Sequence, residues 1–482
     1  MQFRRLPVVV AALVTAGFVP AGLSAARGDL DPTFGSGGKV MTDFGGTEIA
    51  WAVALQRDGR IIVAGDRLDQ RPSDDFLLAR YTAKGSLDPS FDGDGKVATD
   101  FGGRQDGAYD VEIQRDGRIV VAGSSRQGGG SNIALARYKP DGSLDPTFGS
   151  GGKVLTSFGA GGFDDAHAVS LQRDGKVVAA GGTRSGPTRA FALARFLPNG
   201  ALDQSFGSSG RVTTPIPGRD NDRVFALAVQ PDGKLVAAGG SYEGPSDVVL
   251  ARYSQAGHLD PTFGSDGIAV ASFRPKDMVP LQVAVQRDGK LLATGYGGMT
   301  RFTADGRLDR RFTEAAAAVS RIVQPAAAAI QPDGRIIVAG TSGGRSDDFG
   351  VARLTTAGRL DPTYGRSGVV STDFRSGSAD HANDAVLSSD GKLTVAGATG
   401  PAWDFAVARY VATAFCVVPN VRGRALRAAR TVLARAACRV GEVRRRYSRT
   451  VAKGRVISQR PRAGARLAEA TKVDLVISRG RR

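Results

Sequence analysis

The residues of this chain best suited to catalysis or ligand binding are carboxylates in short loops. They are Asp106, Asp164, Asp165, Asp220 and Asp222, in loops that differ from one another in sequence. Glycoside hydrolysis needs two carboxyl groups about 5 to 9.5 Å apart, so a glycan hydrolase or lyase is one function that these residues allow. Their spacing along the chain does not establish which of them lie that close.

The three histidines, His167, His258 and His381, stand in unrelated settings. A metal cluster or a serine–histidine–aspartate triad needs partners at defined spacing, and the sequence offers none around them. The glycine-rich runs lack the strand, helix and lysine of a phosphate-binding loop. We therefore expect no cofactor, no metal and no catalytic residue, and His381 joins the aspartates as a candidate for ligand contact.

Positive charge is concentrated at the C-terminal end. From Cys416 to Arg482 there are 19 Lys and Arg against three acidic residues, a net of +16 out of +17 for the whole chain. Such a concentration attracts anionic partners, although a solvated charged face is the alternative. Nucleic acid is not the expected partner, because Tyr447 is almost the only aromatic residue available for base stacking. The candidate contacts with an anionic polymer are Arg444, Arg445, Arg446 and Arg449.

Most of these residues are set in a framework that repeats seven times. The phrase Leu-Asp-Pro-Thr-Phe, or a near relative, begins at Leu30, Leu87, Leu144, Leu202, Leu259, Leu308 and Leu360. A second phrase, Gln-Arg-Asp-Gly-Lys or similar, centres on Asp58, Asp116, Asp174, Asp232, Asp288, Asp333 and Asp390. A fixed period of this length indicates a repeat architecture in which each unit is one supersecondary module.

Each unit contains four strand-sized pieces, which in the first unit are residues 39–44, 51–56, 60–64 and 76–81. The Asp-Gly pair between the second and third pieces predicts a tight hairpin with positive φ at both central residues. Four strands per unit and seven units predict an all-β seven-bladed β-propeller; a β-solenoid, whose repeats are usually shorter, is the weaker alternative. The array begins with two strands of a unit and ends with the other two, so we expect one blade to combine both chain ends.

The repeats can now be compared with a known family. The segments Asp116-Gly-Arg-Ile-Val-Val-Ala-Gly123 and Ile133-Ala-Leu-Ala-Arg-Tyr138, running into Gly142-Ser-Leu-Asp-Pro-Thr-Phe148, resemble the delta-60 repeats over about residues 28–410. The resemblance implies an architecture and no chemistry. One departure predicts an irregular sixth blade: the loop and strand between Gly295 and Arg301 are short, and the alanine-rich residues 315–329 follow.

One face of the predicted propeller carries loops that vary between units, whereas the two repeated phrases fall on the other face. Ligands usually contact loops held on a rigid scaffold, so the variable face is the candidate ligand surface. Drift in solvated loops is the alternative. The candidate residues on this face are Asp106, Asp164, Asp165, Asp220, Asp222 and His381.

The C-terminal segment has a different pattern, with a helix predicted over residues 424–436 and strands over 440–445, 456–459 and 473–478. The phrases Val418-Pro-Asn-Val421, Val456-Ile-Ser-Gln459 and Val473-Asp-Leu-Val-Ile-Ser478 are similar to a single PASTA domain over about residues 416–480. PASTA domains occur on penicillin-binding proteins and on the exported part of bacterial Ser/Thr kinases, so the resemblance implies contact with peptidoglycan.

The N-terminal residues have the charged start, short apolar run and small-residue end of a secretory signal, with Ser24 and Ala26 at the expected cleavage positions. The mature chain is then predicted to be exported and to contain no transmembrane segment. The compartment outside the cytoplasm is oxidising, so we expect a disulfide between Cys416 and Cys438, the only cysteines; two separate thiols are the alternative.

The predicted organisation has five parts: a signal peptide (1–26), the propeller (28–410), a short linker (411–415), the PASTA-like domain (416–480) and a basic tail (481–482). The function we expect is that of an exported, non-catalytic envelope protein with the propeller as interaction platform and the basic domain on the wall. A glycan-active enzyme and a purely structural surface protein are the competing classes.

Overall fold

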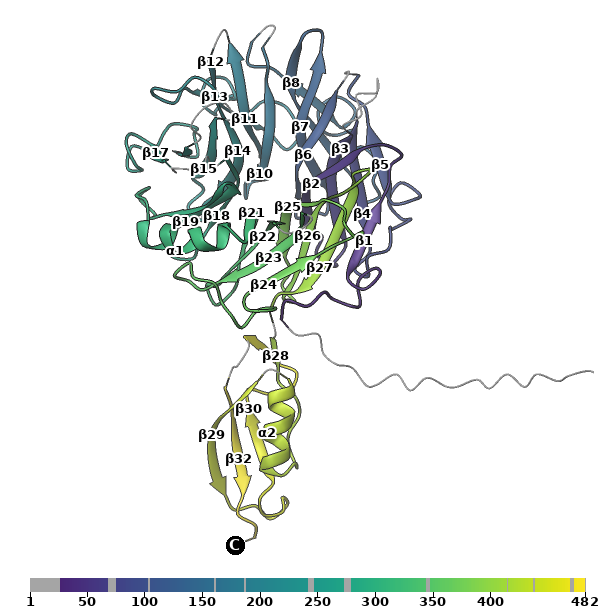
Figure 1. Cartoon of the computed structure of the whole chain (residues 1–482), viewed down its shortest axis with the longest axis vertical. Helices are drawn as coiled ribbons and strands as arrows, with labels where there is room; N and C mark the ends of the chain where they lie inside the picture. Colours follow the sequence, from purple (N-terminus) through teal and green to yellow (C-terminus); the bar gives the residue numbers. More distant parts are fainter. Residues whose placement is uncertain are drawn as a thin grey trace, which may run out of the picture.

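The computed structural model describes residues 27–481 apart from residues 68–74, 103–104, 160–161, 186–187, 242–246, 273–278, 344–346, 414, 437 and 469–471. The predicted signal peptide, residues 1–26, lies outside the described residues. Within them no helix is long and apolar enough to cross a membrane. Figure 1 shows a ring of sheets, coloured purple to green, and a small domain in yellow-green tones that contains the C-terminus.

Seven antiparallel sheets form the ring, and we number them as blades one to seven. Blade one has β2 (Glu48–Leu55), β3 (Ile61–Arg67), β4 (Phe76–Tyr81) and β5 (Lys96–Thr99), and blade two has β6 (Asp106–Ile113), β7 (Ile119–Gln127), β8 (Gly130–Tyr138) and β9 (Lys153–Thr156). Blade three has β10 (Asp165–Leu171), β11 (Val177–Ser185), β12 (Thr188–Phe196) and β13 (Arg211–Thr214). Blade four has β14 (Asp222–Val229), β15 (Leu235–Ser241), β16 (Val248–Tyr253) and β17 (Ile268–Ala271).

The remaining blades complete the circle. Blade five has β18 (Val279–Val285), β19 (Leu291–Tyr296) and β20 (Gly298–Phe302). Blade six has β21 (Val323–Ile330), β22 (Ile336–Ser342), β23 (Asp348–Leu354) and β24 (Val369–Thr372), and blade seven has β25 (Asp380–Leu387), β26 (Lys392–Thr399), β27 (Asp404–Val411) and β1 (Lys39–Thr42). The first strand of every blade contacts the first strand of the next, and β25 contacts β2, so the seven-bladed ring is closed and the prediction is confirmed.

Blade seven joins both ends of the array, as predicted, because β1 pairs with β27. The ends contribute one strand and three, not two and two. A tight hairpin keeps its two strands in one sheet, so β25 and β26, which the Gly391 turn joins, cannot belong to different blades. Each blade therefore begins one strand before the Asp-Gly turn.

The Asp-Gly turns also differ from the two-residue hairpin that we predicted. In the first, Gln56 N–H bonds to the Arg60 carbonyl and Gly59 N–H to the Gln56 carbonyl, which leaves three residues in the loop. Gly59 has φ +87°, whereas Asp58 is not among the residues with positive φ. This is a type I turn followed by a left-handed residue, and it needs only the glycine.

The irregularity predicted from the sixth repeat falls in blade five. The first strand-sized piece of each repeat forms the fourth strand of the preceding blade. In blade five, α1 (Arg310–Ser320) therefore takes the place of the fourth strand. Asp309 caps the helix by accepting a hydrogen bond from Phe312 N at 3.2 Å, and an alanine run, a strong helix former, follows. Blade six itself is a regular four-stranded sheet.

The repeated phrases build the same buried contact in every blade. In all seven units the arginine near the end of the third strand forms an ion pair of 2.7–3.0 Å with the aspartate of Leu-Asp-Pro-Thr-Phe. Its guanidinium lies 3.9–5.0 Å from the ring that ends the phrase. Arg137, for example, is 4% exposed and also donates to the Pro198 carbonyl in the next blade. The phrases are therefore structural, because a buried charge must be paired.

The C-terminal domain combines one helix with two small sheets. α2 (Leu426–Arg435) contacts a sheet with the strand order β29 (Arg439–Arg446), β32 (Lys472–Ser478), β30 (Val456–Arg460), and β28 (Phe415–Val417) pairs with β31 (Arg466–Ala468). β29 runs parallel to β32 and is an edge strand. The helix and the three longer strands match the predicted elements, whereas β28 and β31, each three residues long, were not predicted.

Candidate functional site

Three aspartates predicted on the variable face are buried and bonded to their own loops. Phe101 N–H donates to Asp106 at 2.6 Å, and Phe158 N–H donates to Asp164 at 2.7 Å. Asp222 forms an ion pair with Arg219 at 3.0 Å, although its burial still raises its pKa. Each carboxylate thus terminates the connection that enters the first strand of a blade.

Asp165, Asp220 and His381 lie in different settings. Asp165 contacts three positively charged or titratable groups, Arg189 at 3.1 Å, Arg223 at 3.4 Å and His167 at 3.7 Å. Burial alone would raise the pKa of Asp165, but these groups outweigh it and lower the pKa to about 2. Asp220 is exposed, and half-buried His381 stacks on Trp403 with ring centroids 5.1 Å apart. The six candidates lie on four different blades and do not form one site.

Three further clusters of carboxylates lie at three successive junctions between blades: six with seven, seven with one, and one with two. They are Asp348 with Asp373 and Asp380, Asp43 with Glu48 and Asp404, and Asp75 with Asp100 and Asp106, each with oxygens within 4.8 Å of one another. Oxygen ligands of this kind suit hard cations. The protein already supplies partners for several of them: Phe374 N–H donates to Asp380 at 2.7 Å, and Arg375 pairs with Asp404.

The central channel of the propeller is a further candidate site. A cavity of about 600 Å³ is lined by the first strands of six blades, β2, β6, β10, β14, β18 and β25. Its walls combine aromatic rings with carboxyl groups. The lining residues that matter below are Trp51, Tyr109, Asp110, Glu112, His167, Arg223, Phe225, Gln282 and Asp384.

These channel carboxyls were missed in the sequence because they stand inside strands rather than in loops. A signal was present: when the seven repeats are aligned, Asp110 and Asp384 occupy a position that is alanine in four other units. Burial raises the pKa of Glu112 to about 7 and that of Asp384 to about 6. It also raises the pKa of Asp110 well above its usual range.

The candidate wall-binding arginines, Arg444, Arg445, Arg446 and Arg449, are all exposed. The first three lie on the edge strand β29. In the described part of this domain the recorded ion pair is Arg444 with Glu442 at 2.8 Å. Most of the basic side chains among these described residues are therefore outside ion pairs.

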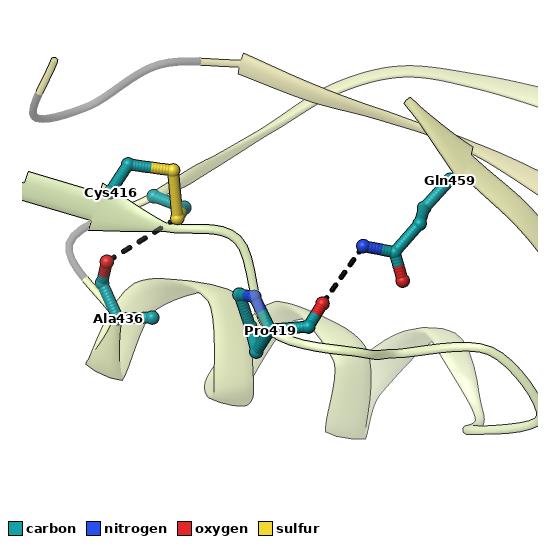
Figure 2. Close-up of a disulfide and its surroundings, with 5 residues drawn as sticks. Cys416, Pro419, Ala436 and Gln459 are labelled. Carbon is teal, nitrogen blue, oxygen red and sulfur yellow. Dashed lines mark hydrogen bonds between the residues drawn. A yellow bond between two sulfur atoms is a disulfide. The ribbon is translucent and has the colours of Figure 1, made fainter. Parts of the chain in front are cut away.

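The disulfide between Cys416 and Cys438 is present, with Cα atoms 4.7 Å apart, which confirms the prediction. Figure 2 shows it beside the contact that joins two of the recognised phrases: Gln459 Nε2 donates to the Pro419 carbonyl at 2.8 Å. The Gln459 Oε1 atom accepts from Val421 N–H at 2.8 Å. One glutamine side chain thus fixes the segment that leads into α2.

The fold and its sites define a class, a closed repeat β-propeller joined to a small α+β domain with a basic surface. Five segments, residues 56–91, 114–148, 172–206, 230–263 and 331–364, match the family described as domain of unknown function (DUF5122) beta-propeller, and residues 417–479 match the PASTA domain. The chain is thus a protein of DUF5122 β-propeller repeats with a C-terminal PASTA domain, as the two resemblances predicted.

The curated and solved proteins to which the chain is similar cover different parts of it. A probable serine/threonine-protein kinase of Clostridium acetobutylicum is 43% identical over 63 residues, 13% of this chain and 10% of the kinase. The chain thus spans about a tenth of that relative's length. Virginiamycin B lyase of Staphylococcus aureus has a TM-score of 0.47 at 9% identity, over 77% of this chain and 98% of the lyase. A gluconolactonase of Xanthomonas campestris has a TM-score of 0.37 at 14% identity, over 81% and 98%.

Proposed function

We propose that this protein is exported and attached to the cell wall, where it acts as a non-catalytic binding protein. The PASTA domain contacts peptidoglycan or an anionic wall polymer, and the propeller is the interaction platform. One observation carries the proposal: the positive charge of the PASTA domain is exposed and largely unpaired among the described residues, whereas that of the propeller signature is buried and paired.

The geometry of the basic surface supports a contact with a long polymer. Arg444, Arg445 and Arg446 follow one another along an edge strand, and the Arg444 side chain is 72% exposed. Tyr447, 52% exposed, continues this edge, with the Arg479 guanidinium 5.7 Å from its ring centroid. Exposed charge of one sign attracts an anionic partner within a Debye length, about 10 Å at 0.1 M salt. The disulfide and the PASTA domain are both consistent with a location outside the cytoplasm.

The non-catalytic part of the proposal is supported by the state of the loop carboxylates. A glycan hydrolase needs a free acid and a free base or nucleophile facing one substrate. Asp106 and Asp164 instead accept backbone N–H groups, Asp222 pairs with Arg219, and Asp165 is surrounded by cations. These carboxylates stabilise loops.

The test is cosedimentation of the full chain with insoluble wall material at rising salt. In the variant R444Q/R445Q/R446Q/R449Q we expect binding at low salt to weaken at least tenfold. Each basic residue near an anionic surface contributes about 1 kcal/mol, so four neutral substitutions exceed the 1.4 kcal/mol that a tenfold change requires. Walls with and without their anionic polymer distinguish the two sources of negative charge.

The matched control is R57Q/R115Q/R173Q/R287Q, which removes four exposed arginines from the Asp-Gly turns of the propeller. It changes the net charge equally and should bind like the wild type. Equal losses in the two variants, or wall binding that salt does not release, would show that the PASTA surface is not the contact.

A further inference from the structure

Every first strand of the propeller contains a β-bulge at the same place. The register against the second strand skips one residue, between Ala50 and Ala52 in blade one and at the equivalent position of each other blade. A bulge leaves its extra residue out of the ladder and redirects the side chain. The bulged residues are Trp51, Tyr109, His167, Phe225, Leu281, Ala326 and Asn383, and all but Ala326 line the central cavity.

Aromatic rings occupy the bulges of blades one to four. Tyr109 stacks on His167 with centroids 4.7 Å apart, and His167 lies 5.3 Å from Phe225. Trp51 stands in blade one and donates its indole N–H to Asp66 at 2.7 Å. One side of the channel is therefore an aromatic wall.

Carboxyl groups lie next to this wall, and the repeats show that the fold does not need their charge. The residue after the bulge is alanine in four blades and aspartate in two, Asp110 and Asp384. Each aspartate accepts a hydrogen bond from the next blade: Asp110 from Val169 N–H at 2.7 Å, and Asp384 from Val53 N–H at 2.9 Å. The neutral Gln282 makes the same bridge in blade five, where its Oε1 accepts from Ala328 N–H at 2.5 Å.

Glu112, two residues after Asp110 in β6, is a further carboxylate that the repeated framework does not require. The equivalent residues in the other blades are uncharged: Ala54, Ser170, Ala228, Ala284, Ala329 and Val386. Neither a bridge nor a packing contact common to the repeats accounts for a carboxylate there. The negative charge of the channel is therefore a feature of this site and not of the propeller framework.

The charged and titratable groups that face the channel do not neutralise these carboxyls. β6 contributes Asp110 and Glu112 and β25 contributes Asp384, while the lining residues of β2 and β18 carry no charge. β14 contributes Arg223 and β10 contributes His167, and both contact Asp165. Burial raises the pKa of Glu112 to about 7, with a smaller contribution from the charge of Asp384. Burial also raises the pKa of Asp384 to about 6, so both groups titrate close to neutrality.

We infer that the central channel binds an organic cation of the alkylammonium class, with the ammonium group among Asp110, Glu112 and Asp384 and the carbon chain against Trp51, Tyr109 and Phe225. Ammonium groups are attracted both to carboxylates and to aromatic faces. Asp110, Glu112 and Asp384 are half-buried residues that line the cavity, so a solute in the channel lies against them. This inference rests on the platform part of the proposed function and names its ligand class.

Neutral polyols and metal ions suit the site less well. A sugar would stack on the rings but would leave the carboxylates without a counter-charge. A hard metal ion would be held by the oxygens but gains nothing from the aromatic wall, because such ions take oxygen ligands. An alkylammonium ion satisfies both halves of the lining.

The experiment follows the fluorescence of Trp51 in the full chain carrying W403F, which removes the only other tryptophan. The probes are hexan-1-amine and its neutral counterpart hexan-1-ol, in about 0.5 M NaCl to screen surface charge. We expect the amine to bind at least tenfold more tightly than the alcohol at about pH 8. We also expect its affinity to fall at least tenfold towards pH 5 as Glu112 and Asp384 take up protons, since an alkylamine stays charged throughout this range.

The decisive variants are Glu112→Gln, which keeps the size of the side chain, and D110N, which keeps an acceptor for Val169 N–H. Each should weaken amine binding at least fivefold at about pH 8 and flatten its pH dependence. The matched control is Glu314→Gln on the exposed surface of α1, where the same chemical change should alter nothing.

Equal affinity for amine and alcohol, undiminished amine binding in folded Glu112→Gln, or preferential binding of N-acetylglucosamine or Ca²⁺ would each overturn the inference. The titration contains no wall material. Its failure would therefore leave wall attachment by the PASTA domain intact, and a failed cosedimentation would leave the channel result intact.

Discussion

Arginine has opposite placements in the two domains. In the propeller, the seven arginines that close the third strands are buried between a carboxylate and an aromatic ring, as with Arg137 between Asp145 and Phe148. In the PASTA domain, Arg445 and its neighbours lie on an edge strand and are exposed. In the first arrangement the charge is paired inside a blade and the guanidinium also bonds to a carbonyl of the next blade, whereas the second leaves charge for a partner.

The comparison shows why net charge alone is a poor guide to function. The propeller contains nearly equal numbers of basic and acidic residues, so its many arginines contribute little to a net external field. The PASTA domain contains fewer basic residues, and among its described residues the ion pair present is Arg444 with Glu442. Pairing and burial, not the number of arginines, decide which surface attracts a polymer.

The largest effect expected from this contrast is on stability. Arg137→Ala removes the ion pair with Asp145, the contact with Phe148 and the bond to the Pro198 carbonyl. Breaking a buried pair on one side typically costs 3–5 kcal/mol, and because Arg118 still contacts Asp145 at 2.8 Å we expect about 3 kcal/mol or somewhat more. Denaturant unfolding of the propeller, followed by circular dichroism, measures it.

The matched substitution in the other domain is Arg445→Ala. An exposed side chain without a recorded partner should change the unfolding free energy by less than about 0.5 kcal/mol. If Arg137→Ala were equally mild, the repeated arginine would not be the contact that joins the blades.

The architecture was predictable because the same pattern of residues occurs in seven repeats. We predicted the seven-bladed ring from the two repeated phrases, the four strand-sized pieces of each unit and the Asp-Gly turn. We predicted the disulfide from the positions of Cys416 and Cys438. The phase of the blade was wrong by one strand. Sequence gives the period of a repeat, but the boundary of a blade depends on which strands hydrogen-bond.

The candidate site was predicted less well, for a physical reason. Loop carboxylates such as Asp164 look available in a sequence, but backbone N–H groups of the same loop bind them once the chain folds. The channel carboxyls looked like ordinary strand residues, because a β-bulge changes which way a side chain points and leaves no pattern in a single repeat. The roles predicted for Asp220, His381 and the exposed arginines stay predictions.

A smaller effect on stability is expected from removing the disulfide of the PASTA domain. This domain has a small core, and the bond closes a loop of 22 residues. In the chain-entropy model a loop of this length contributes about 3 kcal/mol, so C416A/C438A should unfold at lower denaturant concentration. The propeller contains no cysteine, so the denaturant concentration at which it unfolds should not change. A shift of both unfolding transitions would mean that the two domains unfold together.

The smallest effect concerns a hydrogen bond that four junctions between blades share and three lack. Tyr138 Oη donates to Thr99 Oγ1 at 2.8 Å, and tyrosines 81, 253 and 410 make the same bond, whereas Phe196 stands at the equivalent position opposite Thr156. A buried hydrogen bond of this kind contributes about 1 kcal/mol, so Tyr138→Phe should lower the unfolding free energy by about that amount. A double-mutant cycle with Thr99→Val isolates the pair from the cost of leaving the threonine unsatisfied.

The reverse substitution, Phe196→Tyr, tests the same bond by adding it. If the blades are joined by repeated pairwise contacts, the new hydroxyl should reach Thr156 and raise the unfolding free energy by up to about 1 kcal/mol. A loss of stability would show instead that the space between blades two and three is already filled. The junctions would then differ in packing as well as in hydrogen bonding, and the contrast with the PASTA domain would rest on the buried arginines alone.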